Sequence, residues 1–453
     1  MTVDAMQTTS LYEGPRGIAV KILNRIERTD SYLEKLLDAE LRSDELNDLD
    51  KGLLTEIIHG VMRWRLKLDW VLTGFFHGNF TKAEVNVRNC LRVALYQILF
   101  LDRVPHFAAA NEAVEFIKRI RGEKTADLVN AVIRNILRSL NKIHYPTAEE
   151  DPIKHLSVVY SHPAWMVKRW VSRYGFAETE KLLIANNEKP ELTLRVNRLK
   201  ADVPTMLSYL EQHQVPYTKS PYLDYFVKVR HLADISQSEA FRQGLFTVQD
   251  ESAGLPCLLL SPQHGERIID LCAAPGGKTT FIGEMMKNTG EIVSVDKYES
   301  KLHLIKENCD RLGIRNVKFV VDDGTTYGGG IADRVLVDAP CTGLGVLSKK
   351  PDIKWKREPE DIGALTTLQL QLLQNAARLV KPSGVLVYST CTTEPEENFE
   401  LVRRFMDLHP SFIIDDPKRF VPAELTSPEG GVNTLPSRHQ MDGSFAVRLT
   451  RTI

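Results

Sequence analysis

An apolar strand and a glycine turn follow each other in the segment Arg267-Ile268-Ile269-Asp270-Leu271-Cys272-Ala273-Ala274-Pro275-Gly276-Gly277-Lys278-Thr279. The β-branched, apolar start predicts a buried strand that ends where proline and two glycines interrupt it. Residues 279–287 then have the pattern of a helix. Glycines at such a turn let a ligand approach the backbone closely, and the helix start behind them offers free N–H groups. The segment therefore predicts a nucleotide-type site at the carboxyl end of a parallel strand.

The lysine after the two glycines also invites comparison with a phosphate-binding loop. That motif requires a glycine five positions before Gly277, where this chain has Cys272. The G-x-G-x-x-G pattern of dinucleotide-binding folds is absent as well. A tight turn without any ligand therefore stays open as an interpretation of this segment alone.

Four further segments have a strand pattern, and each is closed by a polar or thiol residue. They cover residues 290–296, 317–321, 333–338 and 384–391, with helices predicted at 301–312 and 359–380. The carboxyl ends of parallel strands line one crevice of an open α/β sheet, so we expect Asp296, Asp323 and Asp338 near the glycine turn. Asp296 closes the second strand, where an acid would hold a pair of ribose hydroxyls.

Three motifs, in this order, resemble the signature of the S-adenosylmethionine-dependent RNA cytosine-5 methyltransferases: Asp270 to Thr279, Asp338-Ala339-Pro340-Cys341 and Ser389-Thr390-Cys391. The resemblance implies a Rossmann-like α/β methyltransferase domain with S-adenosyl-L-methionine as its cofactor. The cofactor-binding residues that it implies are Cys272, Ala273, Ala274, Pro275, Gly276, Gly277, Lys278, Asp296, Asp323 and Asp338.

The same resemblance implies catalytic roles for three side chains. Cys391 is expected to be the nucleophile, and Cys341 to assist product release, either as a base or by easing elimination. Asp338 is expected to hydrogen-bond N3 and the amino group of cytosine, or to orient the cofactor. Carbon 5 of cytosine is a poor nucleophile until a thiolate adds to carbon 6, and a thiolate both adds and leaves readily.

A free cysteine is more often a small buried hydrophobic residue than a functional one. Cys90, Cys257 and Cys309 fit that description and are assigned no function, and in Cys272 we expect the backbone to matter more than the sulfur. The six cysteines have no zinc spacing and no C-x-x-C pair. They are expected to be reduced thiols of a cytoplasmic protein without a metal.

Residues 11–142 are predicted to form an all-helical bundle that resembles the NusB-type RNA-binding domain. The likeness lies in residues 105–116 and 128–138. Local basic clusters are Arg63-Trp64-Arg65-Leu66-Lys67, Lys118-Arg119-Ile120-Arg121 with Lys124, and the pair Arg134 and Arg138, one helical turn apart. Each cluster alone is better explained by a solvated helix face than by RNA contact.

The rest of the chain is predicted to form a middle α+β domain at residues 152–240 and the methyltransferase domain at 241–453, while residues 1–10 are expected to be a tail. Helices are predicted at residues 155–174 and 203–212, and strands at 191–196 and 225–229. Residues 244–255 would open the methyltransferase domain with a strand and then a helix, capped by Asp250 or Ser252. The middle domain is explained equally well as a spacer or as an RNA-binding surface.

A glycine-containing, basic segment follows Cys341. Residues 343–357 hold five basic side chains from Lys349 to Arg357, together with Trp355. Such a loop beside an active site is suited to hold phosphates and to stack an unpaired base. We therefore expect it to contact RNA.

Whole-chain properties limit the function classes. The 453 residues suggest two to four domains, and no apolar run is long enough to span a membrane. The net charge of −1 excludes a global basic field, so nucleic acid would be bound by local patches. A monomer with RNA as its partner is expected.

The domain order resembles the bacterial small-subunit ribosomal RNA cytosine-5 methyltransferases of the RsmB/Fmu/Sun type. The expected product is 5-methylcytosine in 16S ribosomal RNA, formed through a covalent cysteine–cytosine adduct. Two alternatives stay open: a methyltransferase of another RNA such as tRNA, and a non-catalytic RNA-binding protein on the same scaffold. Cys341 and Cys391 argue against the second alternative, since a scaffold needs neither thiol.

Overall fold

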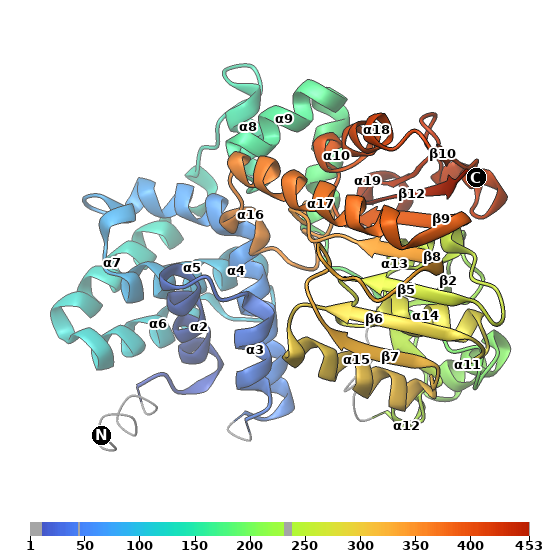
Figure 1. Cartoon of the computed structure of the whole chain (residues 1–453). Helices are drawn as coiled ribbons and strands as arrows, with labels where there is room; N and C mark the ends of the chain where they lie inside the picture. The colour runs from blue at the N-terminus through green and yellow to red at the C-terminus, as the bar shows by residue number, and fades with distance from the viewer. Residues whose placement is uncertain (1–10, 44–45, 231–237, 453) are drawn as a thin grey trace, which may run out of the picture. The chain divides into compact units, whose positions relative to one another are not determined.

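The computed structural model describes residues 11–43, 46–230 and 238–452 (Figure 1). The expected tail at residues 1–10 lies outside this part. The chain forms two compact units, which we call the helical unit and the sheet unit. The helical unit contains the residues up to Glu188 together with Leu347–Lys356, and the sheet unit contains Lys189–Val346 and the residues from Arg357 onward.

Among its described residues, the helical unit begins with six helices. They are α2 (Gly14–Arg28), α3 (Leu33–Leu41), α4 (Asp48–Phe75), α5 (Val85–Phe100), α6 (His106–Arg121) and α7 (Glu123–Arg138). Apolar residues at helical spacing predict helices around residues 19–26, 53–61, 87–101, 108–120 and 126–140, which agree with five of the six, whereas α3 was not predicted. Gly122, with φ of 81°, separates α6 from α7, because the left-handed region that this sharp junction requires is open to glycine.

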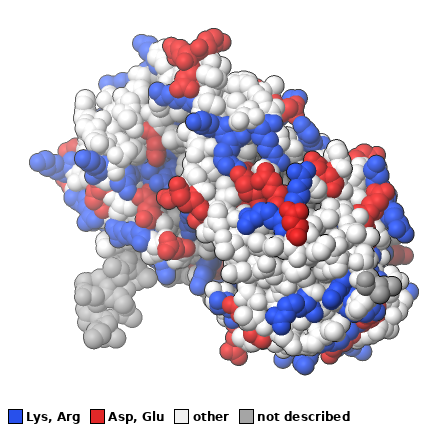
Figure 2. All heavy atoms as spheres, turned by 45° about the horizontal axis from the view of Figure 1, so that its top comes forward, with Lys and Arg blue, Asp and Glu red and all other residues white. Residues whose placement is uncertain are grey.

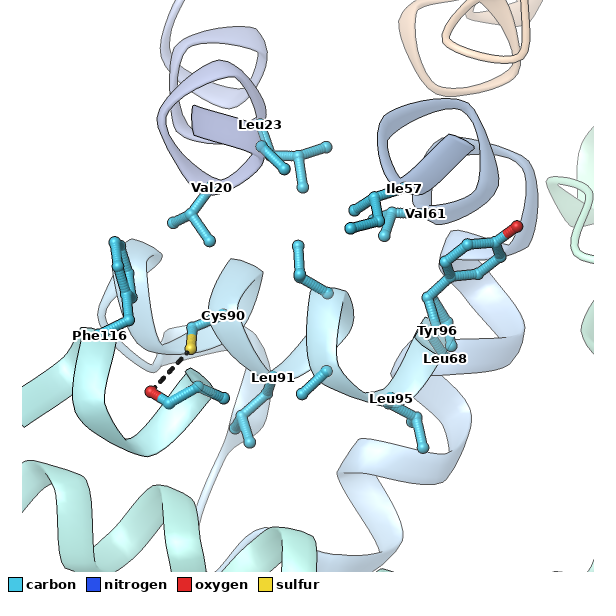
Figure 3. Packing of buried hydrophobic residues seen from close by; sticks show 14 of the residues in the cluster. Val20, Leu23, Ile57, Val61, Leu68, Cys90, Leu91, Leu95, Tyr96 and Phe116 are labelled. Atoms are coloured by element: carbon cyan, nitrogen blue, oxygen red, sulfur yellow. Dashed lines mark hydrogen bonds between the residues drawn. The ribbon is translucent and has the colours of Figure 1, made fainter. Parts of the chain in front are cut away.

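Helix α5 forms the centre of this unit, with apolar side chains of α2, α4 and α6 packed around it (Figure 3). Leu91 and Leu95 of α5 are buried, as are Leu23 of α2 and Ile57 of α4. Each fully buried side chain of this size contributes about 1.5–3 kcal/mol to stability. The Cys90 thiol lies in the same core and donates to the carbonyl oxygen of Ala113 at 3.4 Å, which agrees with a structural role.

Three more helices belong to the helical unit: α8 (Pro152–Val159), α9 (Ala164–Tyr174) and α10 (Phe176–Asn187). The single helix predicted over residues 155–174 is therefore wrong. Ser161 has a φ of 55° and Pro163 follows it, so the chain turns between α8 and α9. Helix α10 was not predicted.

The segment Leu347–Lys356 is part of the helical unit although the residues on either side of it belong to the sheet unit. It ends in the short helix α16 (Ile353–Lys356). The ammonium of Lys354 is fully buried and donates to the carbonyl oxygens of Arg63 and Ser161, at 3.3 Å each, and to Oδ1 of Asn187 at 2.8 Å. Burial, with the charge of Arg63, holds the pKa of Lys354 well below its usual value.

Trp355 of this inserted segment also faces inward. Its Nε1 donates to the carbonyl oxygen of Met62 at 2.6 Å, and the guanidinium of Arg65 lies 5.6 Å from the centre of its ring. The predicted RNA-contacting role is therefore wrong for Lys354 and Trp355. A basic, aromatic composition suggested an exposed loop, but these side chains complete the helical core.

The sheet unit contains a small antiparallel sheet with the order β2 (Tyr217–Lys219), β3 (Phe226–Val229), β1 (Leu192–Val196), β4 (Phe246–Val248). Helices α11 (Val203–Gln212) and α12 (Glu239–Arg242) accompany it. Strand β4 was expected to open the methyltransferase domain, but it pairs with β1 and so belongs to the small sheet. Asp250 caps the next helix, α13 (Glu251–Leu260), as predicted, by accepting a hydrogen bond from the backbone N of Ser252 at 2.9 Å.

The large sheet has five parallel strands and an antiparallel edge (Figure 1). Its order is β7 (Val317–Val321), β6 (Glu291–Asp296), β5 (Arg267–Leu271), β8 (Ala332–Asp338), β9 (Val380–Thr390), β12 (Ser444–Arg451), β10 (Phe412–Ile414), and β11 (Val432–Thr434) pairs with β12. The five parallel strands are those predicted from the sequence. The mixed order, with a reversal between β5 and β8, is that of an open Rossmann-like sheet.

Alternate residues of each parallel strand contribute to two different cores. Ile269, Val293 and Val335 pack on the side of α17 (Pro359–Leu379) and α18 (Phe399–Leu408). Ile268, Ile292 and Leu336 pack on the opposite side with α13 and α14 (Gly277–Met285). Helix α15 (Glu299–Leu312) adds a smaller cluster with Ala273. Both faces of the sheet are covered, so ligands can reach it only at the strand ends.

Charges of both signs are mixed on the surface. On the face drawn in Figure 2, Lys and Arg side chains are interspersed with Asp and Glu side chains. This pattern agrees with the net charge of −1. Among the described residues, no helix combines the length and the apolar character that crossing a membrane requires.

Candidate active site

The glycine turn and the Asp338 motif lie at the point where the strand order reverses. Strand β5 pairs with β6 on one side and with β8 on the other, and Leu271 is in register with Val337. The chain leaves β5 into the turn and leaves β8 into the segment that carries Cys341. A crevice at the carboxyl ends of the strands opens at such a reversal, which makes it the expected ligand site.

The two cysteines that the sequence singles out are neighbours in the structure. Their sulfur atoms are 3.2 Å apart, and the backbone N of Cys391 donates to the Cys341 sulfur at 3.3 Å. Cys391 follows β9 and is exposed, whereas Cys341 is half-buried. The ends of β8 and β9, which are neighbours in the sheet, therefore bring the two thiols together.

The environment distinguishes the two thiols. The hydrogen bond with Cys391, burial, and the negative charges of Cys391 and Glu397 raise the pKa of Cys341 well above its usual value. The Cys341 thiol therefore gives up its proton less readily than an isolated cysteine does.

Asp338 is held by two donors, one for each carboxylate oxygen. Ser389, its neighbour across β8 and β9, donates to Oδ1 at 2.8 Å, and the ammonium of Lys278 lies 2.6 Å from Oδ2. Burial would lower the pKa of Lys278, but the charge of Asp338 outweighs burial and raises it. Sequence reasoning missed this ion pair, because the two residues are 60 positions apart and no local pattern joins them.

The turn after β5 has the geometry that its glycines predict. Gly276 has a φ of 99°, and a Cβ there would lie 2.8 Å from Cγ2 of Ile305. Only glycine therefore fits, and as the N-cap of α14 it offers no side chain to the helix start. Cys272 has a φ of 61°, and burial raises the pKa of its thiol to about 12, so its sulfur is unreactive.

Two acids lie at neighbouring strand ends, and Asp296 supports the turn directly. Oδ2 of Asp296 accepts a hydrogen bond from the backbone N of Ala274 at 3.2 Å, and Oδ1 accepts one from the backbone N of Tyr298 at 3.1 Å. Asp323 accepts hydrogen bonds from the backbone N and hydroxyl of Thr325 and one from Lys297, which lower its pKa to about 2. Both carboxylates are anchored by backbone N–H groups, and Asp323 stays charged at neutral pH.

A further carboxyl group lies beneath the turn. Asp270 is fully buried in β5, and its Oδ2 accepts a hydrogen bond from the Thr279 hydroxyl at 2.6 Å. Burial raises the pKa of Asp270 to about 7. The sequence showed Asp270 only as part of a strand. Its complete burial was not predicted, because it depends on the helices that cover both faces of the sheet.

The helix behind the turn is held from the small sheet. Arg195 of β1 is fully buried and donates to Oε1 of Glu284 at 2.6 Å and to the carbonyl oxygen of Gly277 at 2.8 Å. The small sheet therefore supports the start of α14. The sequence did not indicate this role.

Comparison with known proteins identifies the relatives of this arrangement. "Probable ribosomal RNA small subunit methyltransferase B" of Bacillus subtilis (strain 168) is 38% identical over 438 residues, which cover 95% of this chain and 97% of that protein. Residues 257–450 match the family model described as 16S rRNA methyltransferase RsmB/F. The chain belongs to the RsmB/F family.

Other comparisons extend the RsmB/F likeness over the rest of the chain. Residues 13–138 match the NusB family, and residues 162–236 match the ferredoxin-like domain of RsmF/B-like methyltransferases. The protein of the same printed name from Synechocystis sp. is 34% identical and covers 96% of this chain and 99% of its own length. The crystal structure of PH0851 has a TM-score of 0.80 at 30% identity and covers 96% of this chain and 98% of its own.

These findings confirm the family resemblance and the fold class. A NusB-like helical bundle and a Rossmann-like methyltransferase sheet are both present. Among the described residues, no cluster of three or more His, Cys, Asp or Glu side chains is arranged to hold a metal ion.

Proposed function

We propose that this chain transfers a methyl group from S-adenosyl-L-methionine to carbon 5 of a cytosine in small-subunit (16S) ribosomal RNA, through a covalent adduct with Cys391. One observation carries the proposal: two cysteine sulfurs lie 3.2 Å apart at the strand ends where the sheet order reverses. A fold that only bound RNA would need neither thiol. The names of the curated relatives support ribosomal RNA as the substrate.

The residues of the glycine turn fit S-adenosyl-L-methionine. The start of α14 carries no side-chain cap, so its N–H groups are suited to a carboxylate, and the Asp296 carboxylate is suited to ribose hydroxyls. When bound, this cofactor supplies a methyl group on a positively charged sulfur. The residues proposed to hold it are Cys272, Ala273, Ala274, Pro275, Gly276, Gly277, Lys278, Asp296, Asp323 and Asp338.

Cys391 is the proposed nucleophile. Its thiolate adds to carbon 6 of cytosine, and the electrons of the 5,6 double bond move so that carbon 5 becomes nucleophilic. After methylation the proton on carbon 5 is removed, the double bond forms again, and the sulfur–carbon bond breaks with its electrons returning to Cys391. The exposed position of Cys391 suits this role, because the ring must reach its sulfur.

Asp338 and Cys341 complete the proposed chemistry. A proton shared between Asp338 and cytosine N3 draws electrons from carbon 6 and favours addition, and Lys278 holds the Asp338 carboxylate in place. Cys341 assists release of the product. It acts either as the base that takes the proton on carbon 5 or by easing the departure of Cys391.

The test is a Cys391→Ala variant of the full chain. We expect it to lose methyl transfer while S-adenosyl-L-methionine binding, measured by calorimetry, is unchanged. Cys309→Ala, which removes a buried thiol on α15, is the matched control and should keep its activity. If Cys391→Ala transfers methyl groups near the wild-type rate, Cys391 is not the nucleophile. Mapping 5-methylcytosine in ribosomal RNA from a strain without this protein identifies the target.

A further inference from the structure

Glu397 is a buried carboxylate that the proposed reaction does not use. It lies at the end of a 3-10 turn, η4 (Pro395–Glu397), and is 0% exposed. Its Oε2 accepts hydrogen bonds from the backbone N of Thr342 and from Nε2 of Gln369, both at 2.9 Å. The hydroxyl of Thr342 donates to Oε1. Glu397 therefore binds both the backbone and the side chain of the residue that follows Cys341.

The same contacts extend to both sides of the thiol pair. Nε2 of Gln369 also donates to the carbonyl oxygen of Pro340 at 2.9 Å, so the residue before Cys341 is tied to the same network. The hydroxyl of Thr342 lies 2.8 Å from that of Thr392, the residue after Cys391. The positions of both sulfur atoms therefore depend on one buried acid and the donors around it.

Charges of opposite sign face the two thiols. Burial raises the pKa of the Glu397 carboxyl, whereas hydrogen bonds from Thr342, Gln369 and Thr392 act to lower it. As an anion, Glu397 interacts electrostatically with Cys341, whereas the cation of Lys278 interacts with Cys391. Arg357 is also near, but its guanidinium donates to the carbonyl oxygens of Thr342 at 3.0 Å and Cys341 at 3.3 Å. The other titratable groups beside the pair are Asp338, which the Lys278 ammonium neutralises, and the Tyr388 hydroxyl, which donates to the carbonyl oxygen of Glu397 at 2.7 Å.

We propose that Glu397 is a positioning residue for the thiol pair: it fixes the turn that carries Cys341, and its negative charge keeps the shared proton on Cys341, which leaves Cys391 as the thiolate. When the pair loses one proton to solvent, the negative charge resides on the sulfur of Cys391, which interacts electrostatically with the Lys278 ammonium. This inference deepens the proposed function and depends on its assignment of Cys391 as the nucleophile.

The test separates the charge of Glu397 from its shape. Glu397→Gln keeps the shape and removes the charge, whereas Glu397→Asp keeps the charge and shortens the reach to Thr342. In a Cys391→Ser background, the rate at which iodoacetamide alkylates Cys341 is followed by mass spectrometry between pH 6 and 11. We expect Glu397→Gln to move the midpoint of the rate–pH curve down by about one pH unit, because a neighbouring anion disfavours the thiolate.

Controls distinguish this effect from simple loosening of the fold. Loosening would raise the alkylation rate at every pH without moving the midpoint, and Glu397→Asp should keep the midpoint. Glu400→Gln, an exposed glutamate in the next turn of the chain, should change neither rate nor midpoint. With Cys391 present, we expect Glu397→Gln to lower kcat about tenfold or more while KM for S-adenosyl-L-methionine is unchanged.

An unchanged midpoint in Glu397→Gln would overturn the proposal. If that variant does not fold, Thr342→Val is the second test, because it removes one donor to Glu397 and keeps the charge. We expect it to lower kcat without moving the midpoint downward. A wild-type kcat in Thr342→Val would overturn the positioning role. The alkylation measurement needs no RNA. The two proposals can therefore fail separately. Methyl transfer by Cys391→Ala would refute Cys391 as the nucleophile. The midpoint of the Cys341 alkylation curve would still show whether the charge of Glu397 acts on Cys341.

Discussion

Cys341 and Cys391 have different surroundings although their sulfurs are 3.2 Å apart. Cys391 is exposed, and the pKa of the half-buried Cys341 thiol is raised by its hydrogen bond with Cys391, by burial and by the nearby negative charges. If Cys341 assists release, a Cys341→Ala variant should add to cytosine through Cys391 but fail to leave. We expect a covalent RNA–protein adduct, visible as a slow-migrating band on a denaturing gel. Absence of that band, with normal turnover, would contradict the release role.

Asp270 makes the stability of the fold depend on pH. Burial raises the pKa of Asp270 to about 7 in the folded protein, whereas the ordinary value of an aspartic acid is 3.8. Between these two values the folded state therefore holds a proton that the unfolded state has lost. The contribution of Asp270 to the free energy of unfolding is fully present below about pH 4 and is lost as the pH rises to about 7. The total effect is of the order of a few kcal/mol.

An Asp270→Asn variant should remove this dependence. Asparagine stays neutral, so we expect the fall in Tm between pH 5 and pH 8 to be smaller in the variant than in the wild-type protein. Calorimetry at four pH values measures it. Asp127→Asn, on the exposed side of α7, should leave the pH dependence as it is. A Tm profile in Asp270→Asn that is parallel to wild type would show that Asp270 does not titrate in this range.

At the level of residues, the sequence identified groups with motifs and missed groups with only spatial partners. The glycine turn was predicted from its position at a strand end, and the two thiols were singled out by the family resemblance of their motifs. The sequence did not predict three other features: the Lys278–Asp338 ion pair, the hydrogen bonds around Glu397 and the raised pKa of Asp270. Each of them depends on burial or on residues that are distant in the chain.

At the level of elements, periodicity located most helices and the five parallel strands, but it missed α3 and α10 and merged α8 with α9. It also failed where a short strand depends on its neighbours. Strand β4 belongs to the small sheet because it pairs with β1, which no local pattern shows. The inserted segment Leu347–Lys356 was the largest error. Its lysine and tryptophan have the composition of an RNA loop but are bound within the helical unit.

The position of Trp355 predicts an effect on stability. Trp355→Ala should lower the free energy of unfolding by about 2 kcal/mol, because it removes a half-buried ring and a hydrogen bond to the carbonyl oxygen of Met62. Trp355→Phe keeps the ring and should cost about 1 kcal/mol. Denaturant titration measures both. A Trp355→Ala variant with wild-type stability and weakened RNA binding would instead support the exposed loop that the sequence suggested.

At the level of the whole molecule, the balance of charge limits how RNA is bound. With a net charge of −1, phosphate contacts must come from local groups, and many basic side chains of the helical unit already face acids. Lys118 pairs with Glu123 at 2.8 Å, and Arg119 pairs with Glu13 at 3.1 Å. These pairs explain why basic clusters read from the sequence overstate the positive surface.

Arg134 and Arg138 are the better candidates for phosphate contact. Both are exposed on α7, and within residues 11–43, 46–230 and 238–452 neither forms an ion pair. If the NusB-like part binds RNA, the double variant Arg134→Gln and Arg138→Gln should weaken binding and reduce the slope of log K against log salt by about 1.5. Arg119→Gln, whose cation is already paired, should change the slope less. Equal slopes for the double variant and wild type in a salt titration of RNA binding would exclude this helix face from the interface.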